Sequence, residues 1–393
     1  MKITGIRSTV FEHRMDRPIG DANNPRGRDL NAGLAVFLEA DNGLTGVSLG
    51  NPGQQGDIHA MAQNLLFGRD PRGVVGLWQR MADFAFKGGN RGAVTDVIGA
   101  LDLALWDLKA KANDEPLWKT LGASSRAVKA YASGIDLCLS DDEIRQFYER
   151  QAARGICIGK LKVGLDREGD LRRIGIMKEA LATSGREPIL LIDSNEYWSP
   201  KQAIQHIRYF ERHHEIFWAE EPARRWDYTG LRQVSRAVNA AVATGENLDD
   251  AADFRSLIAH EAADVLQIGV GTGGLTGALR VAQMADGFDL PVSVMNCPGN
   301  YMAHLAAVIP NHIWMEVVDA GRDVVFKHDS RVEDGYIMLG DSPGNGIQFD
   351  EEKLEQYRVT ERSASAAPSP WGRRRGAGLF VVADGEPLEV GEE

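Results

Sequence analysis

The sequence predicts an α/β protein whose larger part is a parallel barrel of eight strands, and three observations support this. The chain has 393 residues, which is too long for one small core and indicates two domains, or a barrel with a lid. After Val128, short β-like runs alternate with stretches of helical length, as parallel strands with helical crossovers do. Eight such runs are present, and eight parallel strands can close into a barrel.

The part of the chain before the barrel has a different pattern. The β-like run Leu34 to Glu39 precedes an Asp-Asn-Gly turn at 41–43, which is typical of a hairpin. From about residue 57 to 122 the pattern is helical. Apolar residues recur there at the three- and four-residue steps of one buried helix face: Val94, Ile98, Leu101, Leu105 and Leu108.

The barrel is expected to occupy the middle of the chain, and a helix-length stretch follows each predicted strand but the last. Residues 323–358 return to β-like texture and could rejoin the N-terminal part. A mobile or additional tail is expected over 359–393, which is rich in Ser, Ala, Pro and Gly. The candidate strands are 128–134, 158–164, 188–195, 217–222, 241–246, 265–270, 290–296 and 312–318.

The composition argues against nucleic acid and membranes as partners. Acidic residues outnumber basic ones by 56 to 44, and the formal net charge of −12 repels phosphate backbones. The only basic cluster, Arg373 to Arg375, lies in the tail and is expected to be solvated. No run approaches the length that crosses a bilayer, and the N-terminus has no apolar stretch of a signal peptide.

Cysteine usage indicates a reducing compartment. Cys138, Cys157 and Cys297 form an odd set without paired spacing, which argues against a disulfide framework and against a thiolate zinc site. We therefore expect a cytoplasmic protein.

Carboxylates end three consecutive strands of the predicted barrel. Asp193 ends the third strand, Glu220 and Glu221 end the fourth, and Glu246 ends the fifth, at spacings of 27 and 26 residues. A parallel barrel carries its chemistry at the carboxyl ends of its strands, so all three lie around one rim. One acidic residue there is most simply a helix cap or a loop charge, but three at regular spacing favour a metal site. Oxygen ligands without His or Cys suit Mg²⁺, and the spacing alone leaves Glu220 and Glu221 as alternatives.

Two lysines end the second strand. Residues i and i+2 of a strand point the same way, so Lys160 and Lys162 are both expected to face the barrel mouth. Two partly desolvated ammonium groups this close are expected to lower each other's pKa, and one could then act as a neutral base.

These motifs resemble a known family. Lys-x-Lys, Asp-x-Asn, Glu-Glu-Pro and Gly-Glu-Asn on successive strands resemble the mandelate racemase subgroup of the mandelate racemase/muconate lactonizing enzyme family, in the enolase superfamily. The resemblance covers about residues 1–358. It implies a TIM-like (β/α)7β barrel over 126–322 and an α+β capping domain over 1–125, to which 323–358 returns. It also implies a homo-oligomer, either a dimer or an octamer.

The resemblance also implies roles for individual residues. Sites of this superfamily combine a Lys or His base with Mg²⁺, which stabilises an ene-diolate. Lys162 would be the base, and Lys160 would neutralise the substrate carboxylate. Glu316, at the end of the eighth strand, would hydrogen-bond that carboxylate. The alignment selects Glu220 over Glu221, and the implied metal ligands are Asp193, Glu220 and Glu246.

Three further residues are expected to bind substrate: Asn195, Asn296 and Arg17. Arg17 belongs to the loop 13–29, together with Arg14, Arg26 and Arg28. In this family the loop covers the site and sets specificity, and its polarity would suit a polyhydroxy or dicarboxylate substrate. Solvated loop charges are an equally good interpretation of these arginines.

The sequence departs from the mandelate racemase pattern on the far side of the barrel. The family has an Asp at the end of the sixth strand and a His at the end of the seventh, where this chain has Gly269 and Asn296. The lysine that muconate-lactonizing relatives carry near the sixth strand is also missing. Asn296 cannot serve as a base at neutral pH.

A single base favours a single-base reaction. We expect a Mg²⁺-dependent lyase in which Lys162 removes the α-proton of a hydroxylated carboxylate and a β-hydroxyl leaves, that is, a sugar-acid dehydratase. A racemase, epimerase or cycloisomerase with an unidentified base is the alternative within catalysis. A catalytically silent metal-binding relative is the alternative outside it.

Other motifs are expected to be structural. Residues 269–274 fit the G-x-G-x-x-G pattern of dinucleotide sites, but they follow the sixth barrel strand and indicate a tight βα loop. His304 lies in an apolar stretch and is expected to pack in a helix. Tyr301 and Cys297 are candidates for the general acid, although a structural role is favoured for each.

Overall fold

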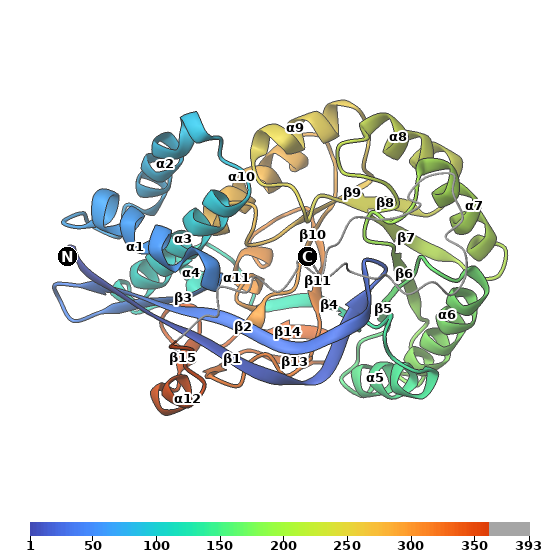
Figure 1. Cartoon of the computed structure of the whole chain (residues 1–393), viewed down its shortest axis with the longest axis horizontal. Coiled ribbons are helices and arrows are strands. Elements are labelled where there is room, and N and C mark those ends of the chain that lie inside the picture. Colours follow the sequence, from blue (N-terminus) through green and yellow to red (C-terminus); the bar gives the residue numbers. More distant parts are fainter. Residues whose placement is uncertain (361–393) are drawn as a thin grey trace, which may run out of the picture.

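The predicted barrel is present and closed in the computed structural model, which describes residues 1–360 (Figure 1). The eight strands are parallel and lie in chain order, and the last pairs with both its predecessor and the first. Each coincides with one predicted run, so the fold class is confirmed. The strands are β4 (Ala127–Ser133), β5 (Ile158–Lys162), β6 (Ile189–Asp193), β7 (Ile216–Glu220), β8 (Ala241–Thr244), β9 (Val265–Ile268), β10 (Val292–Val294) and β11 (His312–Val317).

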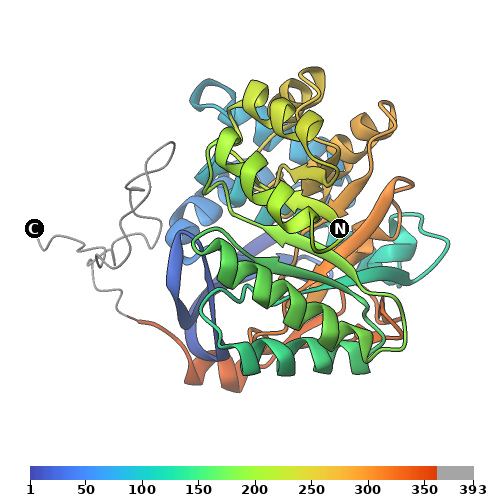
Figure 2. The ribbon, with the colours of Figure 1, turned by 90° about the vertical axis from the view of Figure 1, so that its right-hand side faces the viewer.

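Helices follow the strands and surround the barrel (Figures 1 and 2). Two of them begin with a capping box, formed by Ser140 with Glu143 and by Ser199 with Gln202. The stretch after β10 differs from the prediction, because Gly299 has a φ of 68° and leaves only the 3-10 turn Pro298–Asn300 and one helical turn. The helices are α5 (Asp141–Ala153), α6 (Arg167–Ala182), α7 (Pro200–Glu211), α8 (Tyr228–Ala237), α9 (Ala251–Ala259), α10 (Gly274–Asp286) and α11 (Ala303–Ala306).

The N-terminal part is an antiparallel sheet covered by helices. Its strands are β1 (Ile3–Asp21), β2 (Asn24–Ala40) and β3 (Thr45–Gly50). The segment 13–29 was predicted as a loop, but it is the end of the long β1–β2 hairpin, because the ladder continues as far as Asp21 and Asn24. The other elements are the 3-10 turns Pro52–Gln54 and Phe86–Gly88, the π turn Ala62–Leu66, and α1 (Gln55–Met61), α2 (Val74–Ala85), α3 (Ala93–Ala112) and α4 (Leu117–Thr120).

The β1–β2 hairpin reaches over to the barrel (Figure 1). The N–H of Gly20 donates to the carbonyl of Ile135 at 2.7 Å, and the N–H of Leu137 donates to the carbonyl of Gly20 at 3.1 Å. Residues 135–137 follow the first barrel strand, so the tip of the hairpin lies at the carboxyl end of the barrel. The hairpin is therefore a lid over the predicted site.

The C-terminal segment contacts both parts of the molecule. β14 (Tyr336–Met338) pairs with β4 of the barrel. Phe349 packs on Phe37 of the N-terminal sheet, with ring centroids 5.1 Å apart. The predicted boundaries at 125 and 322 stay a prediction, and the predicted tail lies outside the described residues except for its first two. The remaining elements are β12 (Phe326–His328), β13 (Arg331–Glu333), β15 (Ile347–Phe349) and α12 (Glu351–Gln356).

Within residues 1–360, no helix has both the length and the apolar character that a membrane span requires.

Candidate active site

A layer of charged side chains lies in the barrel interior above an apolar layer. Residues i and i+2 of a strand point to the same side. In four strands a buried apolar residue of the inner cluster is followed two positions later by a charged one, nearer the carboxyl end. These pairs are Ile158 and Lys160 on β5, Leu191 and Asp193 on β6, Trp218 and Glu220 on β7, and Trp314 and Glu316 on β11.

Lys160 joins the carboxylates of three other strands. Its ammonium group forms ion pairs with Glu220, with Glu316 at 3.0 Å and with Asp193 at 3.4 Å. Lys162, at the end of the same strand, pairs with Asp193. All five side chains are buried, so these charges interact in a medium of low polarity.

The charge of Lys160 does act to lower the pKa of Lys162, but the expected net lowering is wrong, because the pKa of both lysines is raised. Burial acts to lower the pKa of Lys162, and so does the charge of Lys160, but the carboxylate of Asp193 outweighs both. For Lys160, burial is outweighed by Glu220 and Glu316. The carboxylates therefore have a larger effect on the pKa of each lysine than the second ammonium group has.

The carboxylates carry more charge than the lysines balance. Burial and the neighbouring Asp193 raise the pKa of Glu220 well above its usual value, and burial raises the pKa of Glu246 to about 7. Oε2 of Glu220 is buried and makes no hydrogen bond within residues 1–360. A divalent cation would supply the missing charge and engage this oxygen, so the predicted ligands fit one.

The carboxylates are not arranged as a finished metal site. Among the described residues, no group of three or more His, Cys, Asp or Glu side chains stands in position to hold a metal ion. Instead, Lys160 forms an ion pair with Glu220, and Lys162 forms one with Asp193. The two ammonium groups thus supply part of the positive charge that these carboxylates require.

The backbone is strained directly after two of the predicted ligands. Asn195 and Glu196 follow Asp193 with φ of 46° and 58°, and Glu221 has a φ of 43°. Residues other than glycine rarely adopt such values, and they cluster at functional sites. Glu221 accepts a hydrogen bond from Asn247 at 2.7 Å and makes no ion pair with the lysines in the described part of the chain. Oε2 of Glu221 is also buried without a hydrogen bond within residues 1–360, so the choice of Glu220 over Glu221 stays a prediction.

Asn296 links Glu316 to Arg322, a residue that no sequence motif indicated. Its Nδ2 donates to Oε2 of Glu316, and its Oδ1 accepts from Nη2 of Arg322 at 2.8 Å. Burial acts to raise the pKa of Glu316, but the charges of Lys160 and Lys162 hold it well below its usual range. Glu316 is therefore ionised here, and it can accept hydrogen bonds but not donate one to a substrate carboxylate.

Three buried residues that the sequence did not indicate hold the backbone of β5. Asp136 accepts from the N–H of Lys162 at 3.0 Å. Arg173 donates to the carbonyl of Lys162 at 3.0 Å, and the hydroxyl of Tyr148 lies 2.5 Å from the carbonyl of Lys160 and 2.8 Å from Asp136. The strand that carries both lysines is thereby fixed from outside the barrel.

Arg17 and Asn195 have structural contacts in the absence of a substrate. The guanidinium of Arg17 donates to the carbonyls of Gly134 and Val318, and it lies over the ring of Phe147 at 4.6 Å. Arg17 thus fastens the hairpin to two barrel strands. The N–H of Asn195 donates to Oδ1 of Asp193 at 2.8 Å. As substrate ligands, Arg17, Asn195 and Asn296 stay predictions.

Comparison with known protein domains agrees with this geometry. The domain described as enolase C-terminal domain-like matches residues 143–353, and the mandelate racemase/muconate lactonizing enzyme N-terminal domain matches residues 9–122. The chain belongs to the mandelate racemase/muconate lactonizing enzyme family.

Individual members of this family resemble the chain over most of its length. The 3,6-anhydro-α-L-galactonate cycloisomerase of Streptomyces coelicolor is 29% identical over 91% of this chain and 99% of its own. A racemase from Streptomyces coelicolor with bound magnesium superposes with a TM-score of 0.82, at 27% identity over 91% of this chain and all of that one. The L-talarate/galactarate dehydratase of Salmonella typhimurium, liganded with Mg and L-lyxarohydroxamate, gives a TM-score of 0.81 at 26% identity, over 91% and 93%.

The chain departs from the mandelate racemase pattern at Gly269 and Asn296, and both positions are involved in other contacts. A Cβ atom at Gly269 would lie 2.9 Å from Sδ of Met295, so Met295 fills the space that a longer side chain would need. Asn296 is bound to Glu316 and Arg322. A second base at either position is therefore absent.

The remaining motifs are structural. Gly274 begins α10 after the sixth strand, and a Cβ there would lie 3.0 Å from the Cα of Gly99, so the glycine permits close packing on α3. His304 is buried, accepts from the N–H of Trp118 at 3.0 Å, and has its pKa lowered to about 4 by burial. Burial raises the pKa of Cys297 to about 12 and that of Tyr301 well above its usual value.

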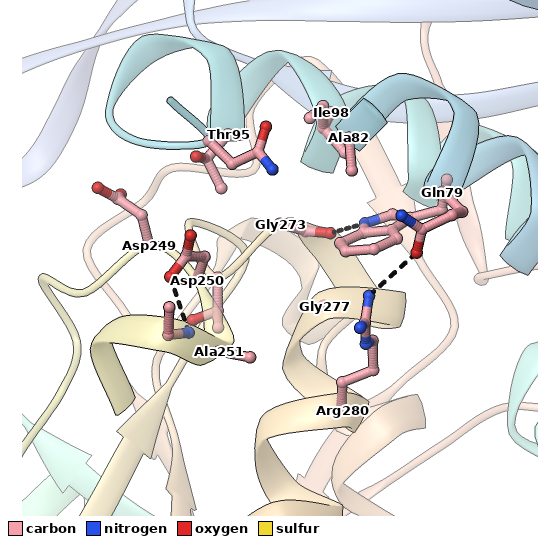
Figure 3. Close-up of a pocket in the computed structure, with 14 residues that line it drawn as sticks. Gln79, Ala82, Thr95, Ile98, Asp249, Asp250, Ala251, Gly273, Gly277 and Arg280 are labelled. Atoms are coloured by element: carbon pink, nitrogen blue, oxygen red, sulfur yellow. Dashed lines mark hydrogen bonds between the residues drawn. The ribbon is translucent and has the colours of Figure 1, made fainter. Parts of the chain in front are cut away.

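A cavity of about 190 Å³ lies between the capping helices and the barrel loops (Figure 3). Trp78 closes one side of it, donating to the carbonyl of Gly273 at 2.7 Å, and Asp249 and Arg280 line other sides. None of the predicted metal ligands or lysines lines this cavity, so it is separate from the charged layer.

Proposed function

We propose that the chain is a Mg²⁺-dependent lyase that removes the proton next to the carboxylate of a sugar acid and expels the β-hydroxyl. The observation that carries the proposal is the pair Lys160 and Lys162 facing three carboxylates at the carboxyl end of the barrel, with no base opposite at Gly269 or Asn296. One face of a bound acid thus meets a lysine, and the other meets an apolar or amide side chain.

The carboxylates of Asp193, Glu220 and Glu246 would hold the ion. The unpartnered Oε2 of Glu220 and the raised pKa of Glu220 and Glu246 support this assignment. Bound Mg²⁺ supplies positive charge that offsets these carboxylates and stabilises an enediolate.

The lysines divide the work on the substrate. Lys160, held between Glu316 and Glu220, neutralises the substrate carboxylate. Lys162 in its amine form takes the α-proton, which requires that its ammonium group no longer pair with Asp193, the carboxylate that raises its pKa. Glu316, which is ionised, orients Lys160 rather than donating to the substrate, and this modifies the role that the resemblance implies.

The atoms of the reaction balance without an oxidant or reductant. The α-C–H bond breaks and its proton goes to the amine of Lys162. The electron pair forms the C=C bond of the enol as the β-C–O bond breaks. The hydroxide leaves as water after it takes up one proton, which balances the proton that Lys162 has accepted. Ketonisation of the enol then gives a 2-keto-3-deoxy acid.

Dehydratase relatives support this reaction. They include the L-talarate/galactarate dehydratase described above and an arabinonate dehydratase of Saccharolobus solfataricus that is 27% identical over 77% of this chain. A cycloisomerase is the second candidate, because the similarity to the 3,6-anhydro-α-L-galactonate cycloisomerase covers nearly the whole chain. Two-base racemisation is disfavoured by Gly269 and Asn296.

The test is a product analysis. The purified chain is incubated with Mg²⁺ and a panel of sugar acids, and proton NMR follows new signals, with a parallel sample depleted of metal by EDTA and then reloaded. A 2-keto-3-deoxy product that requires the metal supports the lyase. An isomer of the substrate would instead establish the second candidate, and a lack of any reaction with bound Mg²⁺ would leave a silent binding protein.

We also propose a cytoplasmic homo-oligomer. The three cysteines are unpaired, which suits a reducing compartment. Phe84 and Phe86, near the end of α2, are 64% and 75% exposed, and exposed aromatic residues that lie together are typical of subunit interfaces. Light scattering coupled to size-exclusion chromatography would determine whether the chain is a dimer or an octamer.

A further inference from the structure

The guanidinium of Arg322 lies at the end of a chain of contacts that begins in the charged layer. Lys160 pairs with Glu316 at 3.0 Å, Glu316 accepts from the amide of Asn296, and Asn296 accepts from Arg322 at 2.8 Å. Arg322 follows β11, the last barrel strand.

Arg322 has no anionic partner in the described part of the chain. No carboxylate of residues 1–360 lies within ion-pair distance of it, and its one hydrogen bond goes to a neutral amide. The nearest acidic neighbour in sequence, Asp323, is engaged elsewhere. It accepts from the N–H of Gly299 at 3.2 Å and pairs with His328 at 3.2 Å.

A partly buried cation without a counter-ion is costly, and here a second cation adds to the cost. Burial lowers the pKa of Arg322, and the like charge of Arg28 on the lid hairpin acts in the same direction, whereas Asp323, Cys297 and Glu316 raise it. A carboxylate that paired with the guanidinium of Arg322 would supply the counter-ion that it lacks within residues 1–360.

Space for a ligand exists next to Arg322. A mainly polar cavity of about 320 Å³ is lined by the basic residues Arg322 and Arg154, by His328, and by the acidic residues Asp16, Asp319 and Asp323. This volume lies near the lower end of small-molecule sites, which is roughly 300–1,000 Å³. Arg322 lines this cavity and also contacts Asn296, whereas neither Lys160 nor Lys162 lines it.

We propose that Arg322 determines substrate specificity by binding a second carboxylate, at the far end of a dicarboxylic sugar acid. The inference rests on the proposed function, in which the first carboxylate binds at Lys160. A guanidinium presents parallel N–H donors that match the two oxygens of a carboxylate, whereas a hydroxyl at the same place would accept only one of them and leave the charge unbalanced.

The experiment compares acids that differ only at the far end. Galactarate is paired with galactonate, and glucarate with gluconate, so that each pair has a terminal carboxylate or a terminal alcohol. kcat and KM are measured with Mg²⁺ for the wild-type chain, Arg322→Met and Arg322→Lys. The control is Arg331→Met, which removes one exposed charge on β13, far along the chain from the site. Melting temperatures verify that each variant folds.

The wild type is expected to prefer the diacid of at least one pair. In Arg322→Met, kcat/KM for that diacid should fall about 10- to 100-fold, mainly through KM, because a charge-assisted contact is lost. The monoacid should change less than about threefold, Arg322→Lys should lose less than Arg322→Met, and Arg331→Met should match the wild type.

Three results would overturn the inference. The first is a wild type that turns over monoacids as well as diacids or better. The second is an Arg322→Met variant that loses activity equally on both classes, which would show a structural role. The third is an Arg331→Met control that loses the preference for the diacid as Arg322→Met does. In each case turnover itself is present and the proposed function stands, whereas no reaction with any acid would remove both proposals together.

Discussion

The ammonium group of Lys160 lies 3.0 Å from the carboxylate of Glu316, although a third strand, β4, separates the strands that carry them. The contact lies in the barrel interior, where Lys160 is over the ring of Tyr131. It connects side chains of the second and eighth strands, which are not neighbours in the sheet. The position of Lys160 therefore depends on the closure of the barrel.

Replacing Glu316 by Gln should lower activity without unfolding the protein. The amide has the shape of the carboxylate but no charge, so Lys160 loses one of its ion pairs and its orientation. We expect kcat/KM to fall about 10- to 100-fold, which corresponds to one charge-assisted hydrogen bond. Steady-state kinetics and the melting temperature measure this, with Glu333→Gln on the exposed β13 as the control. Unchanged kinetics would remove Glu316 from the site.

Magnesium should stabilise the folded chain through Glu246. A ligand at 100 times its Kd adds about 2.7 kcal/mol to the free energy of unfolding. Calorimetry with and without Mg²⁺ should show this increase in the wild type and a much smaller one in Glu246→Gln. Glu261→Gln, on the exposed surface, should respond like the wild type. An equal response of Glu246→Gln would contradict the assignment of this ligand.

Tyr148→Phe should disturb the lysine strand while leaving substrate affinity largely intact. The change removes the hydroxyl that contacts Asp136 and the carbonyl of Lys160, and it leaves buried acceptors without a partner. We expect a loss of about 1–3 kcal/mol in stability and a lower kcat at nearly constant KM. Denaturant unfolding and kinetics measure both. Tyr209→Phe, whose hydroxyl meets Glu168 at the surface, is the matched control and should behave like the wild type. A change confined to KM would argue against a positioning role.

Asp102→Asn should change how stability depends on pH. Asp102 is buried in α3, accepts from the N–H of Thr276 on α10 at 2.8 Å, and has its pKa raised by burial to about 7. The unfolded pKa is about 3.9, so between about pH 4 and 7 the folded state holds a proton that the unfolded state has lost. The stabilisation from the neutral acid is complete below about pH 4 and is lost as pH rises through 7.

The wild type should therefore lose stability relative to Asp102→Asn by up to about 1.4 kcal/mol per pH unit across this window. Urea unfolding of both proteins at pH 5, 6 and 7 gives the difference directly. A difference that does not vary with pH would show that Asp102 is ionised in the folded protein.

Much of the fold could be predicted because parallel barrel strands have a local signature. Each is a short apolar run, and three of the functional strands end in an ionisable residue, as Lys162, Asp193 and Glu220 show. The lid hairpin was not predicted over 13–29, because most residues near its tip are polar and its strands are fixed by pairing with each other. The helix expected after β10 is reduced to the short α11, because Gly299 and Asn300 adopt positive φ, which the sequence does not reveal.

The site could be predicted only in part, for a related reason. Strand ends are local, so the lysines and carboxylates could be found from spacing. No local pattern indicates Asp136, Arg173 or Arg322. Each acts through a contact with a residue more than 20 positions away in the chain. The direction of the lysine pKa shifts was also missed, because it depends on distances to carboxylates of three other strands.

The most direct test of α-proton abstraction is deuterium exchange. The wild type and Lys162→Ala are incubated with Mg²⁺ and a reactive or slowly reacting sugar acid in D₂O, and proton NMR follows the α-proton. We predict that the wild type exchanges this proton or releases it on the way to product, and that Lys162→Ala slows this by about 10²- to 10⁴-fold, as loss of a general base does, while retaining its fold and Mg²⁺ binding. Exchange at the wild-type rate in Lys162→Ala would contradict the account, and so would its complete absence from the wild type with Mg²⁺ bound.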